Sequence, residues 1–538
     1  MTVLPPGVTA SRFHRYVDAL AQVVGQDWVL TSDDDVLTYR DAYTPFKGEP
    51  EEYIPSGAVA PDSVDQVQRI VRLANEYSVP LWPISTGKNL GYGGSAPRLS
   101  GTMILDLKRM NKVLEVNEPL AYALVEPGVS YFDFYRHLRE NNHKVWLDCP
   151  DPGWGSMIGN AMDHGLGRTP FRDHFGSHCG MEVVLPNGEL LRTGLGAIPG
   201  SRGWQTNPYG FGPHVSPIFG QANFGIVTKM GFWLLPEPEA TRFERIFVPK
   251  FEDIHAFLDV MGTLIAEHVV DCSWDLSSPL FSSRDAQVQA AVGRSGGDPS
   301  AELNQLGAER QLAYWSTEVR YYGAPEIIDA KWEYTKRRLS HAMPDVRFKS
   351  EQYFHFPDDR DKLQDTFEGD LTMRAGHGIP SLSIFALGAG RSSGHIFFSP
   401  IIPLSGTEAL RARTAFRKAY QDRGLPWRAP GVGGTHWLGR TLVLLYGFNL
   451  SDDPAHNKKV REDVRYLIKV AADNGWGEYR TPPVFMDDVM DVYSFNNHAF
   501  RRFAESLKDA LDPNGIVAPG RSGIWPKRFR TNKGQASA

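Results

Sequence analysis

The spacing of apolar positions changes along the first part of the chain. Between residues 63 and 77 they recur every three to four positions, which predicts a helix with Asp62 as its cap; these positions are Val64, Val67, Ile70, Val71 and Ala74. A similar spacing predicts a helix over 11–24. Short apolar runs predict strands at 80–84, 103–105, 112–116, 121–126 and 224–235. Two further runs flank Pro186-Asn187-Gly188, so we expect a hairpin over 180–194.

The second part of the chain mixes helical and extended patterns. A proline-containing break over 235–239 marks a candidate domain boundary. Beyond it, helical spacing predicts helices over 254–268, 327–342, 407–420 and 458–473, and apolar runs predict strands over 395–402 and 441–448. A last predicted helix, 497–511, precedes a tail rich in glycine and proline. The patterns together predict an α+β protein of two or three domains.

Composition narrows the class of protein. Of the 538 residues 41% are hydrophobic and 22% charged, and the net charge is −6. Because Lys and Arg are scattered, we expect no nucleic-acid partner. Three cysteines argue against a disulfide framework. His164, Asp173, His174 and His178 fit no standard zinc spacing, so we expect no metal. Without a signal-peptide pattern or a long apolar span, the expectation is a cytoplasmic, soluble protein.

The segment that follows the predicted strand 80–84 is unusually rich in glycine. It reads Pro-Ile-Ser-Thr-Gly-Lys-Asn-Leu-Gly-Tyr-Gly-Gly over 83–94. Successive backbone N–H groups in such a turn form a concave site for anions, and phosphate is the natural guest. The segment matches neither the P-loop pattern nor GxGxxG. From spacing alone, a phosphate cradle and a plain glycine turn are equally good interpretations.

Other glycine turns suit a long ligand that touches the protein at many points. The segment 150–160 reads PDPGWGSMIGN, and shorter turns lie at 225–227 and 520–523. Six segments in this order, PISTGKNLGYGG, DCPDPGWGSMIGNA, FGIVTK, GHIFFSP, GWGEYRT and DPNGIVAPGRSGIWP, resemble the vanillyl-alcohol oxidase and 4-cresol dehydrogenase family. Within that family, the sequence is most similar to bacterial eugenol oxidases.

The resemblance implies a fold and a cofactor. The fold is an FAD-binding domain of two α+β subdomains with an inserted α+β substrate, or cap, domain. It divides the chain into 1–238 (main part of the FAD-binding domain), 239–495 (cap) and 496–538 (return to the FAD-binding domain). The cofactor-binding positions implied are Ser85, Thr86, Gly87, Lys88, Asn89, Gly91, Tyr92, Gly93, Pro150, Gly153, Ser156, Met157, Gly159, Asn160, Thr169, Asp173, His174, Gly225, Ile226, Val227, His395, Arg480 and Arg521.

Five of the matching positions carry chemistry. His395 matches the histidine joined covalently to the flavin 8α-methyl group; a neutral ring nitrogen is a suitable nucleophile, although a lone histidine in a strand is ordinarily a core residue. Tyr92, Tyr479 and Arg480 match a trio that holds a phenol as its phenolate, which hydride loss requires. Asp151 matches an acid/base near flavin N5, although Asp before Pro also caps turns.

The implied function is oxidation of para-substituted phenols by hydride transfer to flavin N5 through a quinone methide. We expect 4-allyl-, 4-alkyl- or 4-hydroxymethyl-phenols as substrates, O2 as acceptor with peroxide as product, and a homodimer or larger homo-oligomer. A dehydrogenase that reduces a cytochrome or copper protein, a flavin-binding protein without catalysis, and a sugar oxidase remain alternatives. Close relatives differ at Arg168, Arg172, Phe397, Pro482-Pro483, Arg521 and residues 435–440, and the changes at Phe397 and 435–440 suggest a reshaped substrate pocket.

Overall fold

The computed structural model describes residues 3–150, 152–272, 274–293, 298–366, 371–382, 394–427, 431–436 and 439–534. Its helices are α1 (Ala10–Val24), α2 (Asp33–Thr38), α3 (Val64–Tyr77), α4 (Tyr131–Glu140), α5 (Met157–Met162), α6 (Ile254–Ala266), α7 (Ala286–Val292), α8 (Ser300–Glu309), α9 (Pro325–Ala342), α10 (Arg360–Thr366), α11 (Leu371–Gly376), α12 (Gly406–Asp422), α13 (Pro454–Asp473), α14 (Met486–Val492) and α15 (Phe495–Leu511). No helix among these residues is both long and apolar enough to cross a bilayer.

Two sheets are built from the first half of the chain. The first has the order β1-β2-β4-β3, in which β3 and β2 both run parallel to β4. The second has the antiparallel order β5-β6-β10-β8-β9. Their strands are β1 (Val29–Leu30), β2 (Gly57–Val59), β3 (Leu81–Ile84), β4 (Met103–Asp106), β5 (Val113–Asn117), β6 (Tyr122–Val125), β8 (His178–Val184), β9 (Leu190–Arg192) and β10 (Ile226–Trp233).

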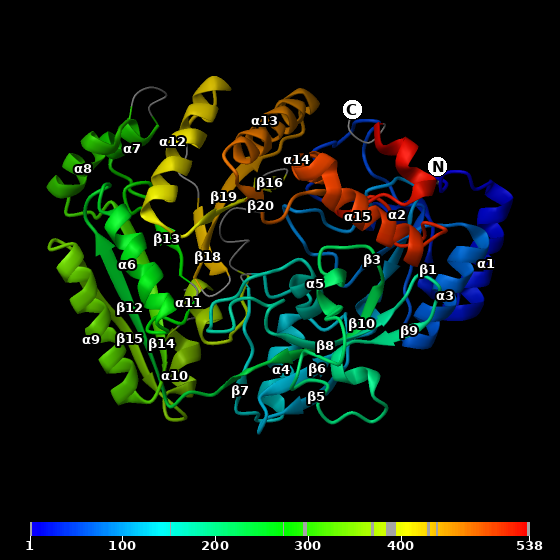
Figure 1. Ribbon diagram of the computed structural model, residues 1–538, viewed down its shortest axis with the longest axis horizontal. Helices are drawn as coiled ribbons and strands as arrows, with labels where there is room; N and C mark the ends of the chain where they lie inside the picture. The colour runs from blue at the N-terminus through cyan, green and yellow to red at the C-terminus, as the bar shows by residue number, and fades with distance from the viewer. Residues whose placement is uncertain are drawn as a thin grey trace.

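A third, larger sheet comes from the second half. Its strand order is β15-β12-β14-β13-β18-β19-β17-β20, and β16 also pairs with β19. Figure 1 shows α9, α6 and α12 lying side by side along one face of this sheet, with α13 beyond them. The strands are β12 (Ala240–Val248), β13 (Leu276–Ser277), β14 (Trp315–Gly323), β15 (Arg347–His355), β16 (His395–Phe398), β17 (Pro400–Pro403), β18 (Gly431–His436), β19 (Thr441–Asn449) and β20 (Gly477–Glu478); the short strands β7 (Val145–Trp146) and β11 (Leu235–Pro236) form a separate pair.

The end of the chain returns to its beginning. Leu81 of β3 forms a bridge with Val517; its N–H donates to the Ile516 carbonyl at 2.7 Å, and its own carbonyl accepts from Ala518 N–H at 2.8 Å. Arg528 donates to the carbonyls of Pro6 and Ser78. Figure 1 accordingly shows the orange-red C-terminal helices beside the blue N-terminal part. The tail therefore helps to fix the strand from which the glycine loop leaves.

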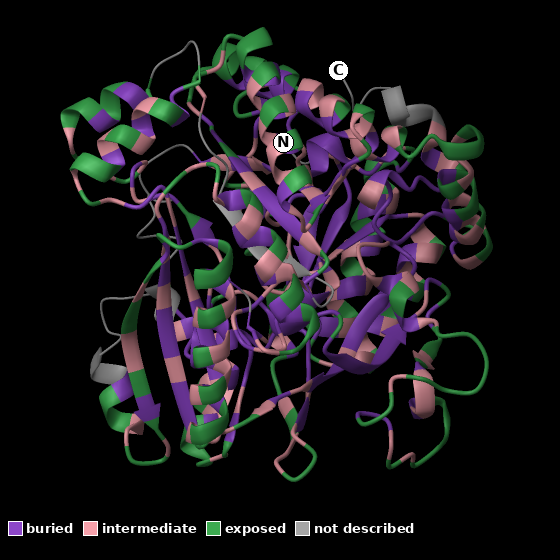
Figure 2. Cartoon of the chain, turned by 60° about the vertical axis from the view of Figure 1, so that its left-hand side comes forward, coloured by how far each residue is buried: buried purple, intermediate pink, exposed green. Residues whose placement is uncertain are grey.

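Most of the burial lies along the strands and the inward helix faces (Figure 2). One apolar core joins α1 and α3 to the first sheet, a second surrounds β6, β8 and β10, and a third lies between the large sheet and helices α6, α9, α12 and α13. Burying such apolar faces contributes roughly 25 cal/mol per Å² removed from water. The arrangement confirms the predicted α+β class.

Most predicted elements are present, and two details were wrong. The predicted hairpin at 180–194 is confirmed as β8 and β9. Asp62 does not cap α3: the N-cap position is Ser63, and Asp62 N–H instead binds the Gln66 side chain. The predicted strand 395–402 is broken at Ser399 into β16 and β17, which pair with different parts of β19. The proposed boundaries at 238/239 and 495/496 stay predictions.

Candidate functional site

A cavity of about 400 Å³ lies between the first two sheets and the large sheet. The glycine loop forms one wall, and loops around α5 and β10 continue it. Side chains of β16 and β19 form the opposite wall. Predicted positions that line the cavity are Ser85, Thr86, Gly87, Lys88, Asn89, Tyr92, Gly93, Pro150, Ser156, Gly159, Asn160, Gly225, Ile226, Val227, Arg480 and Arg521, together with Tyr479.

The loop wall requires glycine at several positions. Gly87, Gly91 and Gly93 have φ of +66°, +82° and +96°, a conformation that side-chain-bearing residues rarely adopt. A Cβ on Gly93 would lie 2.4 Å from Pro483 Cδ, and one on Gly91 would lie 2.8 Å from Phe397 Cδ2. The loop therefore follows the surface of its neighbours closely, and its backbone rather than its side chains shapes the wall.

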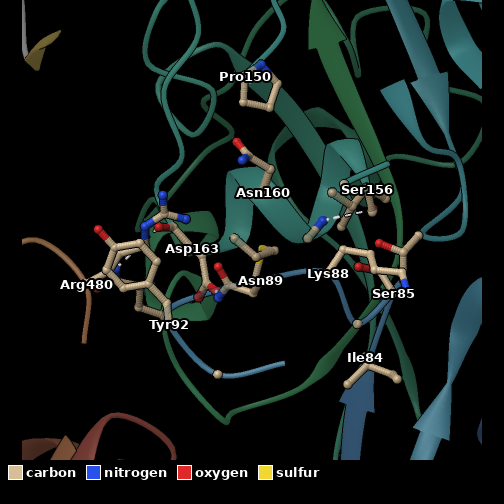
Figure 3. Close-up of a pocket in the computed structure, with 18 of the residues that line it drawn as sticks. Ile84, Ser85, Lys88, Asn89, Tyr92, Pro150, Ser156, Asn160, Asp163 and Arg480 are labelled. Carbon is tan, nitrogen blue, oxygen red and sulfur yellow. Dashed lines mark hydrogen bonds between the residues drawn. The ribbon is translucent and has the colours of Figure 1, made fainter. Parts of the chain in front are cut away.

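The second glycine segment holds α5 against this loop. Ser156 caps α5, because its Oγ accepts from Gly159 N–H at 3.1 Å. A Cβ on Gly159 would lie 2.3 Å from Ser85 Oγ, so glycine permits the two segments to touch. The side chain of Asn160 is held by His174 Nδ1, whose Nε2 lies 2.9 Å from Asp148 Oδ2. Figure 3 shows Ser85 and Ser156 together, and Asn160 projecting from the helix.

Seven predicted cofactor positions are not among the lining residues. Met157 packs in an apolar core, and Gly153 lies against Phe132 and Pro380. Thr169 binds Asp148 through its N–H, and His174 binds Asn160 from behind. Gly91 and His395 do not line the cavity directly, and a Cβ added to Gly91 would lie 3.1 Å from His395 Cδ2. Asp173 accepts a turn hydrogen bond from Gly176, and Asp151 lies outside the described residues.

His395 leaves a buried nitrogen without a partner. Its ring packs against Tyr43 and Phe397, with centroids 5.0 and 4.7 Å away. Among the residues that the structure describes, Nε2 finds no hydrogen-bond partner although it is buried. Burial also lowers the pKa of this imidazole, so the ring is neutral near pH 7. This neutral, unpartnered nitrogen belongs to a ring that packs against Phe397, which lines the cavity.

Tyr92, Tyr479 and Arg480 come together at one end of the cavity. The Arg480 guanidinium lies 4.6 Å from the centre of each tyrosine ring, and the two rings meet edge to face at 6.5 Å. Figure 3 shows Tyr92 and Arg480 at the end opposite Ser85. Burial raises the pKa of Tyr92 to about 12 and also raises the pKa of Tyr479, so both hydroxyls keep their protons.

Sequence reasoning missed a polar chain beside this trio. Arg521 forms an ion pair with Asp163, and Asp163 accepts from Asn89 of the glycine loop. Gln221 donates to the Tyr479 carbonyl at 3.0 Å. Asp163 directly follows α5, the helix that begins within the glycine-rich segment 150–160, so its position could have marked it as a candidate. No motif in the sequence marks Gln221.

The opposite wall is built from side chains of the large sheet and its neighbours. Phe397 stacks on Tyr92 with centroids 5.4 Å apart, and Val443 and Leu445 of β19 lie nearby on the same cavity. Arg168 forms an ion pair with Asp275 at its edge. Of these residues, sequence analysis identified only Phe397 and Arg168, as departures from relatives. The other three lie in segments without a motif.

A second cavity of about 380 Å³ adjoins the first behind the trio. Tyr92, Tyr479 and Arg480 line both cavities, so they form the partition between them. The far wall comes from α14 and α15, where Phe500 and Phe503 are exposed. Glu478 also borders this second cavity.

Comparison with known proteins identifies the fold and family. A family model described as "FAD binding domain" matches residues 55–194. The 4-cresol dehydrogenase [hydroxylating] flavoprotein subunit of Pseudomonas putida is 34% identical, over 97% of this chain and 98% of that protein.

Two solved structures are also similar throughout. The 4-ethylphenol oxidase of Gulosibacter chungangensis, in its isoeugenol complex, aligns with a TM-score of 0.84 and 34% identity over 98% of this chain and all of that one. Substrate-bound p-cresol methylhydroxylase aligns with a TM-score of 0.84 and 32% identity over 97% of this chain and 99% of that one. The predicted flavoprotein fold is confirmed, and the protein is a flavin-dependent oxidoreductase. The chain belongs to the vanillyl-alcohol oxidase and 4-cresol dehydrogenase family of FAD-dependent flavoproteins.

Proposed function

We propose that the protein is an FAD-dependent oxidase of para-substituted phenols, with 4-allyl-, 4-alkyl- or 4-hydroxymethyl-phenols of the eugenol or vanillyl alcohol type as substrates. The observation that carries the proposal is the cluster of Arg480 with Tyr92 and Tyr479 at one end of the cavity. A cation over the rings of two protonated tyrosines suits a phenolate oxygen. The relatives named above act on 4-cresol and 4-ethylphenol by their own descriptions, which supports the same substrate class here.

The residues present fit FAD. The loop with left-handed glycines can approach a pyrophosphate closely, and a Cβ on Gly91 or Gly93 would clash with its neighbours. Two buried nitrogens, His395 Nε2 and Arg480 Nε, have no hydrogen-bond partner in the described structure. A bound ligand could supply one. When bound, FAD would supply the acceptor for a hydride from the side-chain carbon that is attached para to the phenol oxygen.

The side chains of the trio would hold the substrate as an anion. Arg480 attracts the phenolate and lowers the pKa of the phenol. Tyr92 remains a donor because its own pKa is raised to about 12 by burial. Tyr479 Oη donates to the His164 carbonyl at 2.7 Å, so this hydroxyl must turn from His164 to serve the substrate. The expected role of Asp151, activation of water that adds to the quinone methide, stays a prediction.

We propose further that His395 carries the covalent bond to FAD. Its Nε2 is neutral, buried and without a hydrogen-bond partner in the described structure. His395→Ala should bind FAD without the covalent link and oxidise substrate more slowly. Denaturing electrophoresis checks this: flavin fluorescence should stay with the wild-type chain and leave the variant. Fluorescence that stays with the variant chain would contradict the assignment.

The electron acceptor separates two candidate functions. The relatives include both a dehydrogenase and an oxidase, so the competing function is a dehydrogenase that reduces a cytochrome or copper protein. Stopped-flow reoxidation of the substrate-reduced protein by air distinguishes them. Fast reoxidation with peroxide formation supports the oxidase, whereas slow reoxidation together with fast reduction of a dye would favour the dehydrogenase. A cytoplasmic homodimer or larger homo-oligomer remains our expectation.

A peroxide-coupled screen tests the substrate class. Para-substituted phenols should give peroxide, and their meta isomers should not, because a meta substituent cannot form a quinone methide. Aldonolactones and sugars serve as the counter-panel for the sugar-oxidase alternative. Turnover of the counter-panel without turnover of phenols would reject the proposal. Failure of the whole phenol panel to bleach the flavin anaerobically would favour a binding protein without catalysis.

A further inference from the structure

Glu478 is a half-buried acid whose Oε1 is enclosed, and no cation pairs with it among the described residues. Its Oε2 accepts from Ser399 N–H at 3.0 Å. Its Oε1 has no hydrogen-bond partner in the part of the chain that the structure describes. None of the ion pairs found among the described residues includes Glu478. Burial accordingly raises the pKa of this carboxyl to about 8, and the Ser399 N–H opposes that shift only in part.

The carboxyl is connected to the substrate end of the cavity through a single residue. Ser399 lies at the break between β16 and β17, and its Oγ is 2.7 Å from Tyr92 Oη. The same residue therefore binds Tyr92 by its hydroxyl and Glu478 by its backbone. The other titratable groups that face Glu478 are Tyr493 at the end of α14 and, in its own segment, Tyr479 and Arg480. The negative charge of Glu478 acts against ionisation of both Tyr92 and Tyr493.

This arrangement gives an electrostatic reason for a proton exchange. A phenolate at Tyr92 and an ionised Glu478 would place two negative charges close together, of which only the phenolate lies by Arg480. An unpaired buried charge is costly, whereas a charge beside a guanidinium is stabilised. Moving one proton from the phenol to Glu478 therefore transfers the charge from the unfavourable position to the favourable one.

We infer that Glu478, when it is ionised, takes up the proton that a bound phenol loses, through Tyr92 and Ser399. This inference rests on the proposed function. The phenol O–H bond breaks and its proton passes to Tyr92 Oη, Tyr92 passes its own proton to Ser399 Oγ, and Ser399 passes its own to the carboxylate. Rotation of the carboxyl group toward Ser399 Oγ completes the path. The products are a phenolate and a neutral Glu478, with no change in total charge. Glu478 thus acts through Tyr92 and is a positioning residue.

Proton release on binding tests the inference directly. The holoprotein is mixed with 4-chlorophenol, which has no para-carbon hydrogen to lose, in weak buffer with an indicator dye. Below pH 8, where Glu478 is already protonated in the free protein, about one proton should reach solvent per phenolate bound. The pKa of a phenol group is roughly 10. Between pH 8 and that pKa, proton release to solvent should fall towards zero, because Glu478 takes up the proton that the phenol loses.

Glu478→Gln removes the acceptor with little change in shape. The variant should release about one proton per phenolate bound at every pH below the pKa of the phenol. Its dissociation constant for the phenol should therefore keep falling about tenfold for each unit of rising pH, in the range where that of the wild type levels off. Glu408→Gln is the matched control: Glu408 accepts from Nε1 of Trp476, the residue just before β20, at 3.1 Å, and it does not line either cavity. It should behave as wild type.

Ser399→Ala tests the route. It keeps the N–H that binds Glu478 but removes the hydroxyl that binds Tyr92, so phenolate absorbance should appear more slowly while the final proton count is unchanged. An unchanged rate would overturn the route. Equal proton release from the wild type and Glu478→Gln above pH 8 would overturn the inference. Proton release by the wild type that does not change across pH 8 would overturn it as well. If no phenol binds as phenolate in any protein, the proposed function itself fails.

Discussion

Two walls of the main cavity are made in different ways. The glycine loop wall uses backbone: Gly87, Gly91 and Gly93 have positive φ, and an added Cβ would collide with a neighbour. The large-sheet wall uses side chains, chiefly Phe397 stacked on Tyr92 and two aliphatic residues of β19. A backbone wall fixes one shape for a constant ligand. A side-chain wall can change its residues while the strands keep their register, so it suits a ligand that varies between relatives.

The largest effect is expected where the two walls meet. Arg480 touches both tyrosine rings there. Arg480→Ala should lower the rate of flavin reduction by a phenol about 10²- to 10³-fold, the usual loss for one electrostatic stabiliser. Stopped-flow reduction without oxygen measures it. Arg480→Lys keeps the charge but not the planar group and should recover only part of the rate. An unchanged rate in Arg480→Ala would show that Arg480 does not hold the phenolate.

The backbone wall should resist even a methyl group. Gly93→Ala places a Cβ 2.4 Å from Pro483 Cδ at a φ of +96°. We expect a loss of about 2–4 kcal/mol in the free energy of unfolding, from strain and overpacking together. Gly424 is the matched control, because its φ is +64° and nothing lies within 4 Å. Gly424→Ala should cost only about 1 kcal/mol. Denaturant unfolding measures both; equal losses would mean that contact with Pro483 does not shape the loop.

The side-chain wall should tolerate substitution and change specificity. Phe397 packs beside Tyr92, which we place at the phenol oxygen, so it borders the ortho position. Phe397→Ala should raise kcat/KM for 2-methoxy-4-alkylphenols relative to unsubstituted 4-alkylphenols by about tenfold, the scale for a group that gains space in a pocket. Thermal unfolding controls for loss of structure. A fall in kcat/KM for both kinds of phenol, without a change in their ratio, would show that Phe397 does not determine substrate specificity.

The smallest effect is expected at the rim of that wall. Arg168 pairs with Asp275, and the Asp275 side chain is 41% exposed. Exposed ion pairs contribute at most about 1 kcal/mol. Asp275→Asn should therefore change the free energy of unfolding by less than about 1 kcal/mol, as measured by denaturant titration. A larger loss would mean that the pair holds the cavity edge together.

The backbone wall was largely predictable from sequence because it depends on local conformation. Glycines after a strand specify a turn that few other residues can form, so the loop 83–94 was recognisable without its partners. Among helices, α3, α6 and α13 follow from apolar periodicity alone. His395 and the trio were found through motifs.

The rest depends on contacts between distant segments. Asp275 reaches the cavity through a two-residue strand in the middle of the large sheet, and no local pattern marks it. The break at Ser399 follows from how β16 and β17 pair with β19, since the sequence reads as one apolar run. Thr169 and His174, which were expected at the cofactor, do not line the cavity; the Thr169 N–H binds Asp148 and the His174 ring binds Asn160. Their predicted role at the cofactor stays a prediction.

The central claim is that the trio recognises an ionisable phenol oxygen. The direct measurement is anaerobic reduction of the bound flavin by 4-ethylphenol and by its methyl ether, 4-ethylanisole, which has the same shape at the para carbon but cannot form a phenolate. We predict rapid bleaching of the flavin by the phenol and none by the ether. Bleaching at equal rates would contradict the claim, because Arg480, Tyr92 and Tyr479 would then have no anion to hold.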